Sequence, residues 1–327
     1  MSYLRALAPP SKNECFPACQ YFCLASLLIL VLACWSGLRA QNAPDPQDRK
    51  TANPAAAPPP IAIFVHQEIS PGKFAERQNL ENTFARMSDR LSVPSYWVDW
   101  QGLTGYPEAV LFHPLDSFEQ MGQIQADLDS VLAAHSDLAQ LGRQIEDLVV
   151  SEHTIIAARR DDLGYLADDI DMSEARFMRV VNVLLLPGRE LDFAQAMKTR
   201  ADLFTKMHAD VPWVVYQAEA GTNAPAFVIL IPMKDLKQND DLLQWEQGLE
   251  QAAADPTADS LRQIAGESYA SMDSNLYFVN PKTSHVSSDF SSTDPDFWRR
   301  AAAPEPRPDG TPDAKPKPQQ QAHSTKN

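Results

Sequence analysis

Apolar and polar positions follow the same pattern twice along the chain. Residues 61–74, IAIFVHQEISPGKF, and residues 177–190, FMRVVNVLLLPGRE, are both apolar runs rich in β-branched residues. Each run ends in Pro-Gly followed by a basic residue, and the two Pro-Gly pairs lie 116 residues apart. Such runs closed by a turn signal are typical of β-strands.

The register between the two halves continues beyond this first strand. Val93-Pro94 aligns with Val211-Pro212 at an offset of 118, and Pro114 aligns with Pro232 at the same offset. Arg143-Gln144-Ile145 aligns with Arg262-Gln263-Ile264 at an offset of 119. Several matches in order with so little drift indicate an internal duplication.

Each copy contains the same predicted elements. A helix follows the Pro-Gly turn, because Leu80, Phe84, Met87 and Leu91 recur at helical spacing, and Phe193, Met197, Ala201 and Phe204 do so in the second copy. Two strands follow, then a second helical region and a closing strand. The predicted strands are 95–100, 108–113 and 153–159 in the first copy, and 213–219, 226–231 and 274–280 in the second.

The order β-α-β-β-α-β, found twice, predicts an α+β fold of two tandem ferredoxin-like repeats. We place the first repeat at residues 61–160 and the second at 177–285. A ferredoxin-like sheet carries its helices on one face, so its other face must be covered. We expect the two sheets to cover each other and form an intramolecular dimeric α/β-barrel.

The segments outside the repeats have a different composition. Residues 41–60 are Pro- and Ala-rich and predict a disordered linker, and residues 286–327 predict a disordered Pro-rich tail. Between the repeats, residues 161–176 are dense in acidic residues. They do not match a calcium-binding loop, so we interpret them as a solvated connector.

Residues 1–40 have the character of a signal peptide. Residues 22–35 form an uncharged apolar stretch that is short for a membrane span, and cleavage is predicted between Ala40 and Gln41. A retained anchor and lipidation at Cys34 are the alternatives. All four cysteines precede the predicted cut, so the mature chain would have no disulfide and no cysteine metal ligand. The predicted location is the periplasm or the cell exterior.

Charge limits the partners of the folded part. Residues 61–300 contain 19 basic and 37 acidic residues. A surface this acidic repels nucleic acid and anionic lipid. We therefore expect neither nucleic-acid binding nor membrane binding after signal cleavage.

The Pro-Gly-Lys and Pro-Gly-Arg turns after the first strands, together with the duplicated element order, resemble the dimeric α/β-barrel superfamily, and within it the NIPSNAP-like group. The resemblance covers most of residues 61–282. It implies a barrel with a cavity between the sheets. It does not imply one activity, since the superfamily includes monooxygenases, heme-degrading enzymes and chlorite dismutases.

Two polar residues are the first candidates for ligand contacts. Strand alternation places Phe64, His66 and Glu68 on one face, and His66 aligns with Asn182 at the offset of 116. If this face lines the cavity, His66 and Asn182 would contact a ligand. The aromatic residues Trp97, Trp100 and Tyr216 are further ligand-binding candidates, with core packing as the alternative.

Recognisable catalytic motifs are absent from the sequence. It contains no G-x-S-x-G motif and no phosphate-binding glycine loop, and no two histidines stand at metal-ligand spacing. We expect no metal and no cofactor, with heme disfavoured. The sequence favours a monomeric, non-catalytic binding or structural module with a small apolar ligand between its sheets. The alternative is a cofactor-independent monooxygenase-like enzyme.

Overall fold

A computed structural model describes residues 54–251 and 256–298. The predicted signal peptide, its cleavage site at Ala40 and Gln41, and most of the linker lie outside the described residues. Residues 299–327 of the predicted tail also lie outside them. None of the helices in the described part is both long and apolar enough to cross a membrane.

The first half of the chain begins with a short helical turn, η2 (Pro54–Ala56), and strand β1 (Ile61–Ile69). The elements that follow are helix α1 (Phe74–Leu91), strands β2 (Trp97–Gly102) and β3 (Glu108–Leu115), helices α2 (Phe118–Ala134) and α3 (Ser136–Glu146), and strand β4 (Val149–Arg159). The predicted break in the second helical region lies at His135, between α2 and α3. The predicted Pro-Gly turn contains Gly72 at a φ of 77°, a conformation that favours glycine.

The second half repeats this order of elements. After two short turns, η3 (Ala167–Asp169) and η4 (Met172–Glu174), it contains β5 (Phe177–Leu185), α4 (Glu190–Lys206), β6 (Val214–Ala220), β7 (Ala226–Met233), α5 (Lys237–Gln251), α6 (Pro256–Ser268) and β8 (Tyr269–His285). Strand β8 begins five residues before the predicted 274 and β4 begins four residues before the predicted 153. These extensions are largely exposed and lack the apolar alternation that identifies a strand in the sequence.

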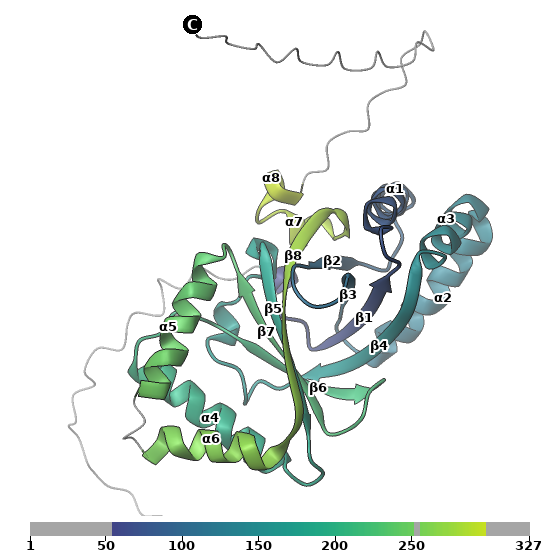
Figure 1. The fold of residues 1–327 in the computed structure, drawn as a ribbon. Helices are drawn as coiled ribbons and strands as arrows, with labels where there is room; N and C mark the ends of the chain where they lie inside the picture. Colours follow the sequence, from purple (N-terminus) through teal and green to yellow (C-terminus); the bar gives the residue numbers. More distant parts are fainter. Residues whose placement is uncertain (1–53, 252–255, 299–327) are drawn as a thin grey trace, which may run out of the picture. The chain divides into compact units, whose positions relative to one another are not determined.

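The eight strands form one closed antiparallel barrel in the order β1-β3-β2-β8-β5-β7-β6-β4 (Figure 1). The two halves meet where β2 pairs with β8 and where β4 pairs with β6. The prediction of a mixed α/β fold built around a barrel is therefore confirmed. Closure also leaves this sheet without an unpaired edge, which protects its backbone groups from pairing with other chains.

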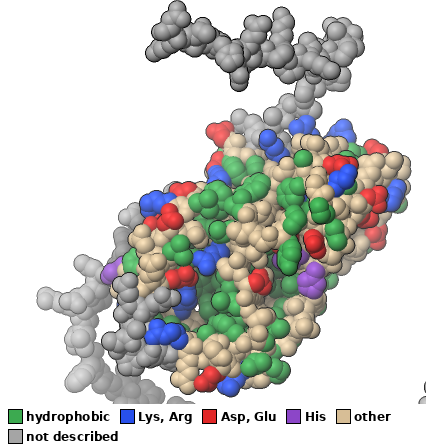
Figure 2. Space-filling view, viewed as in Figure 1, with side chains coloured by type: hydrophobic (Ala, Val, Ile, Leu, Met, Phe, Trp, Pro, Cys, Tyr) green, Lys and Arg blue, Asp and Glu red, His purple; other side chains and the backbone are tan. Residues whose placement is uncertain are grey.

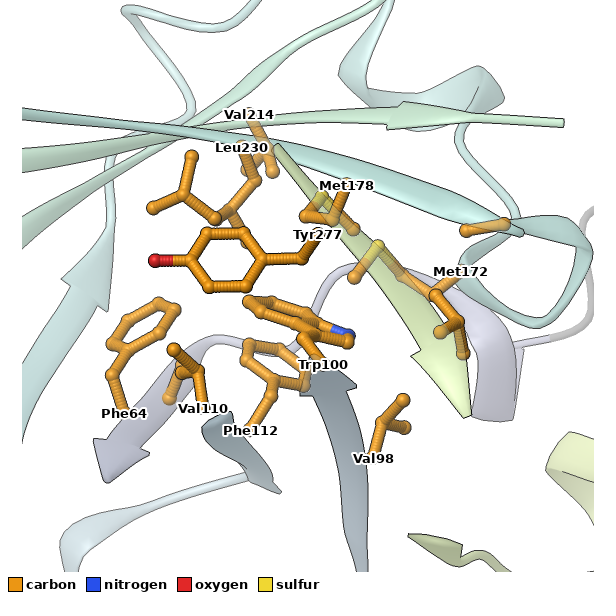
Figure 3. Close-up of a cluster of buried hydrophobic side chains, with 14 of the residues drawn as sticks. Phe64, Val98, Trp100, Val110, Phe112, Met172, Met178, Val214, Leu230 and Tyr277 are labelled. Carbon is orange, nitrogen blue, oxygen red and sulfur yellow. The ribbon is translucent and has the colours of Figure 1, made fainter. Parts of the chain in front are cut away.

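The helices lie on the outside of the barrel, and two apolar clusters result (Figure 1). One cluster fills the barrel interior, where Trp100 stacks on Phe112 with ring centroids 4.8 Å apart and Phe64 packs against both (Figure 3). The other lies between the strands of the second half and α4, around Phe193 and Phe204. On the face shown in Figure 2, acidic, basic and apolar side chains are interspersed.

One end of the barrel is closed by segments that the sequence assigned to linker, connector and tail. Within the acidic connector 161–176, Ile170, Met172 and Ala175 are buried against the barrel core. Because apolar residues alternate with the acidic ones, this segment packs on one side and is solvated on the other. The interpretation of a wholly solvated connector is therefore corrected.

The folded part also continues past the predicted boundary at 286. Two short helices, α7 (Ser288–Ser291) and α8 (Pro295–Trp298), bury Phe290 and Trp298 against the same barrel end. The indole Nε1 of Trp298 donates to the carbonyl of Ser173 at 2.9 Å, and Arg176 forms an ion pair with Asp294. On the linker side, Ala56 is buried, so residues 54–60 also belong to the fold.

Candidate functional site

The opposite end of the barrel is an open mouth with a cavity of about 640 Å³. Its polar lining comes from five strands: His66 and Glu68 of β1, Glu108 of β3, Ser151 and His153 of β4, Asn182 of β5, and Asp273, Asn275 and Tyr277 of β8. An eight-stranded barrel is wide enough to hold one small ligand. The mouth therefore has the size and polarity of a ligand site.

Strand alternation determines why these side chains point inward. Along β1, Phe64 is in the barrel core, and His66 and Glu68 follow at the spacing of two that keeps a side chain on the same face. Likewise Val180 in the core is followed by Asn182 on β5. The interior thus changes from apolar at its middle to polar at the mouth.

Three of the lining residues form a hydrogen-bonded chain. The Nδ1 atom of His66 lies 2.6 Å from Oε1 of Glu108, and the hydroxyl of Tyr277 donates to Oε2 of Glu108 at 2.8 Å. Both oxygens of the Glu108 carboxylate are therefore engaged by side chains that hold it in place. Tyr277 reaches Glu108 across β2, where Gly102 pairs with Tyr277.

The protonation states follow from this arrangement. Burial alone raises the pKa of Glu108, but the hydrogen bond and charge of His66 and the hydrogen bond from Tyr277 outweigh it, so the pKa lies below its ordinary value. Burial, followed by the charge of Glu108 and the hydrogen bond to it, raises the pKa of Tyr277. Glu108 is thus ionised and Tyr277 is protonated near neutral pH.

An ionised carboxylate can only accept hydrogen bonds, so Nδ1 of His66 carries the hydrogen. In the neutral form of the ring, Nε2 is then an acceptor. Nε2 is shielded from water and has no hydrogen-bond partner in the described part of the chain. A buried polar atom without a partner is uncommon in folded proteins and frequently marks a functional site. The arrangement leaves the imidazole oriented and able to accept a proton.

Asn182 lies on the opposite wall, because β1 and β5 are four strands apart in a ring of eight. Its Nδ2 donates to Oδ1 of Asp273 at 3.0 Å, and its Oδ1 is shielded and lacks a partner among the described residues. Among the described residues, each of the two facing walls therefore includes a shielded side-chain atom without a hydrogen-bond partner, Nε2 of His66 and Oδ1 of Asn182.

The two halves of the mouth differ in chemistry. In the strand register, His66 lies opposite Val110 as Asn182 lies opposite Val228, so that His66 corresponds to Asn182 and Glu108 to Ala226. The second half consequently has neither the histidine nor the carboxylate. The His66–Glu108 pair is confined to one wall.

The other predicted ligand-binding residues lie away from the mouth. Trp100 and Tyr216 pack in the barrel core, and the hydroxyl of Tyr216 donates to the carbonyl of Pro59 at 3.0 Å. Trp97 is buried beside Phe84 of α1, with its Nε1 donating to the carbonyl of Thr283 at 2.9 Å. The structure thus brings His66 and Asn182 to one cavity and places the three aromatic residues elsewhere.

Sequence reasoning missed Glu108 and Tyr277. Glu108 could have been found from the sequence. It begins a predicted strand and lies two and four residues before Val110 and Phe112, so it shares their face of the sheet. Tyr277 is 169 residues from Glu108 along the chain, and no local pattern relates the two. Within the described ranges, no cluster of three or more His, Cys, Asp or Glu side chains could hold a metal ion.

A second buried polar cluster lies between α1 and the strands of the first half. The fully buried Arg77 contacts Gln67 through Nη2 at 2.9 Å, Glu81 through Nη2 at 3.2 Å, and Asp99 through Nη1 at 3.4 Å. This cluster connects the helix to the outer face of the barrel. We interpret it as structural.

No family model and no curated protein sequence matches this chain. Solved structures with a similar fold are dimeric α/β-barrel proteins. A putative monooxygenase from Lactobacillus acidophilus is 9% identical, with 69% of this chain and 95% of that chain covered and a TM-score of 0.41. An anthrone oxidase-like protein is 13% identical, with 70% and 93% covered and a TM-score of 0.42.

Chlorite dismutase from Candidatus Nitrospira defluvii in complex with imidazole is also similar, at 9% identity, with 68% and 91% covered and a TM-score of 0.41. The same enzyme appears in complex with cyanide. These likenesses concern the fold.

The neighbours correct two expectations from the sequence. A non-catalytic binding or structural module was favoured, whereas the similar structures are named as monooxygenases, an anthrone oxidase-like protein and chlorite dismutases. No cofactor was expected, with heme disfavoured, whereas the similar structures include chlorite dismutases, which are heme proteins. The expectation of a non-catalytic module rested on the absence of a contiguous catalytic motif from the sequence.

The mouth can be tested against a heme. A histidine that ligates iron commonly gives its other ring N–H to a carboxylate, and His66 with Glu108 has this arrangement. The lining residues, however, include three carboxylates and no lysine or arginine to balance heme propionates. The His66–Glu108 pair therefore suits a heme ligand, whereas the carboxylate lining of the mouth does not suit the heme propionates.

Proposed function

We propose that the barrel mouth is the active site of a monooxygenase-like enzyme in which His66 is the general base. The observation that carries the proposal is the 2.6 Å contact between His66 Nδ1 and Glu108 in the wall of the cavity, which orients the ring, while Nε2 has no hydrogen-bond partner among the described residues. Glu108 is a positioning residue that fixes the ring and its tautomer, and Tyr277 fixes Glu108.

The reaction class that suits this site is the oxidation of a small phenol by dioxygen. Nε2 takes the hydroxyl proton, and Glu108 stabilises the imidazolium that forms. The phenolate gives up its electrons to dioxygen, one oxygen atom enters the ring to give a quinone, and the other leaves as water with two hydrogens from the substrate. The overall balance is phenol plus dioxygen to quinone plus water.

Oxygen uptake with phenol and 4-ethylphenol tests this proposal. We expect His66→Gln to lower kcat roughly a hundredfold or more, the usual contribution of a general base. Glu108→Gln is expected to lower kcat with little change in KM, because it disturbs the orientation of His66 rather than the binding of substrate.

The matched control is His208→Asn, which replaces an exposed histidine after α4. It is expected to keep the wild-type rate, and asparagine tolerates the positive φ of 56° at this position. Wild-type oxygen uptake in a folded His66→Gln variant would refute the proposal. An absorbance spectrum of the same preparation reports whether heme accompanies the protein.

We further propose that the chain is a tandem duplication related to the NIPSNAP-like group, is exported, and works as a monomer in the periplasm or outside the cell. The duplicated element order and the two Pro-Gly turns support the duplication. The signal-peptide character of residues 1–40 supports export. Closure of the barrel within one chain supports a monomer, since the barrel needs no strand from another copy.

A further inference from the structure

Carboxylates outnumber the basic groups in the lining of the mouth, where the basic side chains are the histidines His66 and His153. Glu68, Glu108 and Asp273 line the cavity, and its lining contains no lysine or arginine. The Glu108 carboxylate is bound by His66 and Tyr277. Glu68 and Asp273 receive hydrogen bonds only from neutral groups among the described residues, with Ser151 donating to Glu68 at 3.0 Å.

The wall opposite His66, formed by Asn182 and Asp273, favours a ligand group that donates hydrogen bonds. Oδ1 of Asp273 accepts from Nδ2 of Asn182 at 3.0 Å and from Nδ2 of Asn275 at 3.2 Å. Donation by Nδ2 fixes the Asn182 amide so that its Oδ1 is the group left unpartnered. This wall therefore presents the exposed carboxylate of Asp273, which accepts hydrogen bonds, with the shielded amide oxygen of Asn182 beside it.

The two facing walls select for two different groups on one ligand. His66 needs a group with a removable proton, whereas Asp273 needs a donor that is preferably positive. Tyr106, which also lines the cavity and is 79% exposed, offers an aromatic face to a cation. An anionic ligand would meet three carboxylates and, among the described lining residues, no lysine or arginine.

We propose that the ligand is a small phenol that also carries a primary ammonium group, with the phenol at His66 and the ammonium at Asp273. The phenol end rests on the function proposed above. The ammonium end rests on the carboxylates of the lining and on the exposed Asp273 of the opposite wall. Asp273 is thus a specificity-determining residue.

The test compares three phenols that differ in one substituent: tyramine, which is cationic, 4-ethylphenol, which is neutral, and 4-hydroxyphenylacetate, which is anionic. Their binding to the purified full-length chain is measured by titration calorimetry at low ionic strength. We expect tyramine to bind about tenfold tighter than 4-ethylphenol, and 4-hydroxyphenylacetate to bind more weakly than either. Added salt is expected to reduce the preference, because Asp273 is exposed at the rim.

Two variants that each remove one negative charge test whether the preference for tyramine comes from Asp273 itself or from the overall negative charge of the chain. Asp273→Asn is expected to abolish the preference for tyramine over 4-ethylphenol. Asp241→Asn removes the same charge from the exposed side of α5, where Asp241 pairs with Lys237 at 2.9 Å, and is expected to preserve the preference.

Equal binding of the three phenols, tighter binding of 4-hydroxyphenylacetate, or a tyramine preference that persists in Asp273→Asn would overturn the inference. His66→Gln distinguishes this inference from the proposed function, because it is expected to bind tyramine without oxidising the phenol. A preference for tyramine that depends on Asp273, in a wild-type protein without oxygen uptake, would refute the enzymatic proposal and support the ammonium site.

Discussion

Replacement of Glu81 by glutamine tests whether the buried ion pair below α1 stabilises this protein. Glu81 is 3% exposed and lies 3.2 Å from Arg77, a geometry that is commonly interpreted as stabilising. Burial nevertheless raises the pKa of Glu81 from 4.5 to about 7, against the opposing effect of Arg77 and with a contribution from Asp99. The desolvation of the carboxylate therefore outweighs its attraction to Arg77.

The size and the sign of the effect follow from that pKa. Each pH unit between the unfolded and folded values is worth about 1.4 kcal/mol, so the interval from 4.5 to about 7 corresponds to about 3 kcal/mol. The pKa of Glu81 is higher in the folded state than in the unfolded state. The contribution of Glu81 to the free energy of unfolding is therefore fully present below about pH 4.5 and is lost as the pH rises to about 7. Glutamine imitates the protonated acid and does not titrate.

We expect Glu81→Gln to be more stable than the wild type at pH 8 by about 3 kcal/mol, and by less than about 1 kcal/mol at pH 5. Urea unfolding at a series of pH values measures the difference. Glu76→Gln is the matched control, because Glu76 is on the same helix with a side chain 53% exposed and pairs with Lys73. Its difference from the wild type should stay small at every pH.

A Glu81→Gln variant less stable than the wild type at pH 8 would refute the reasoning. It would mean that the attraction between Arg77 and the ionised Glu81 exceeds the cost of burying the carboxylate. A difference that does not change with pH would show that Glu81 is ionised in the folded protein throughout the range.

Two further predictions concern the ends of the chain. Trp298→Ala is expected to cost about 3–5 kcal/mol in urea unfolding, because it leaves a cavity at the closed barrel end and removes the bond to Ser173; a loss below about 1 kcal/mol would show that α8 contributes little to the fold. Expression of the complete sequence in a bacterium should yield a protein that begins at Gln41, as read by amino-terminal sequencing. A first residue before Cys34 would contradict the predicted cleavage and return the cysteines to the mature chain.

Much of the fold could be predicted from the sequence because its pattern is local and is repeated. Alternation of apolar residues predicted the strands, the spacing of Leu80, Phe84 and Met87 predicted α1, and the Pro-Gly turns marked corresponding points in the two halves. The ends of the folded region were harder to predict from the sequence. Phe290 and Trp298 lie in a stretch too short and too polar overall to indicate burial, and they are buried because the barrel end offers them an apolar surface.

For the candidate site, the sequence by itself determined that His66 shares a face with Phe64 and Glu68 and corresponds to Asn182, because alternation is a property of a single strand. Only the tertiary structure decided the partners of His66. Glu108 reaches it because β3 pairs with β1, and Tyr277 reaches Glu108 because the barrel closes through β2 and β8 over Gly102. Hydrogen bonds between residues so distant along the chain depend on strand order, which no local pattern of side chains specifies.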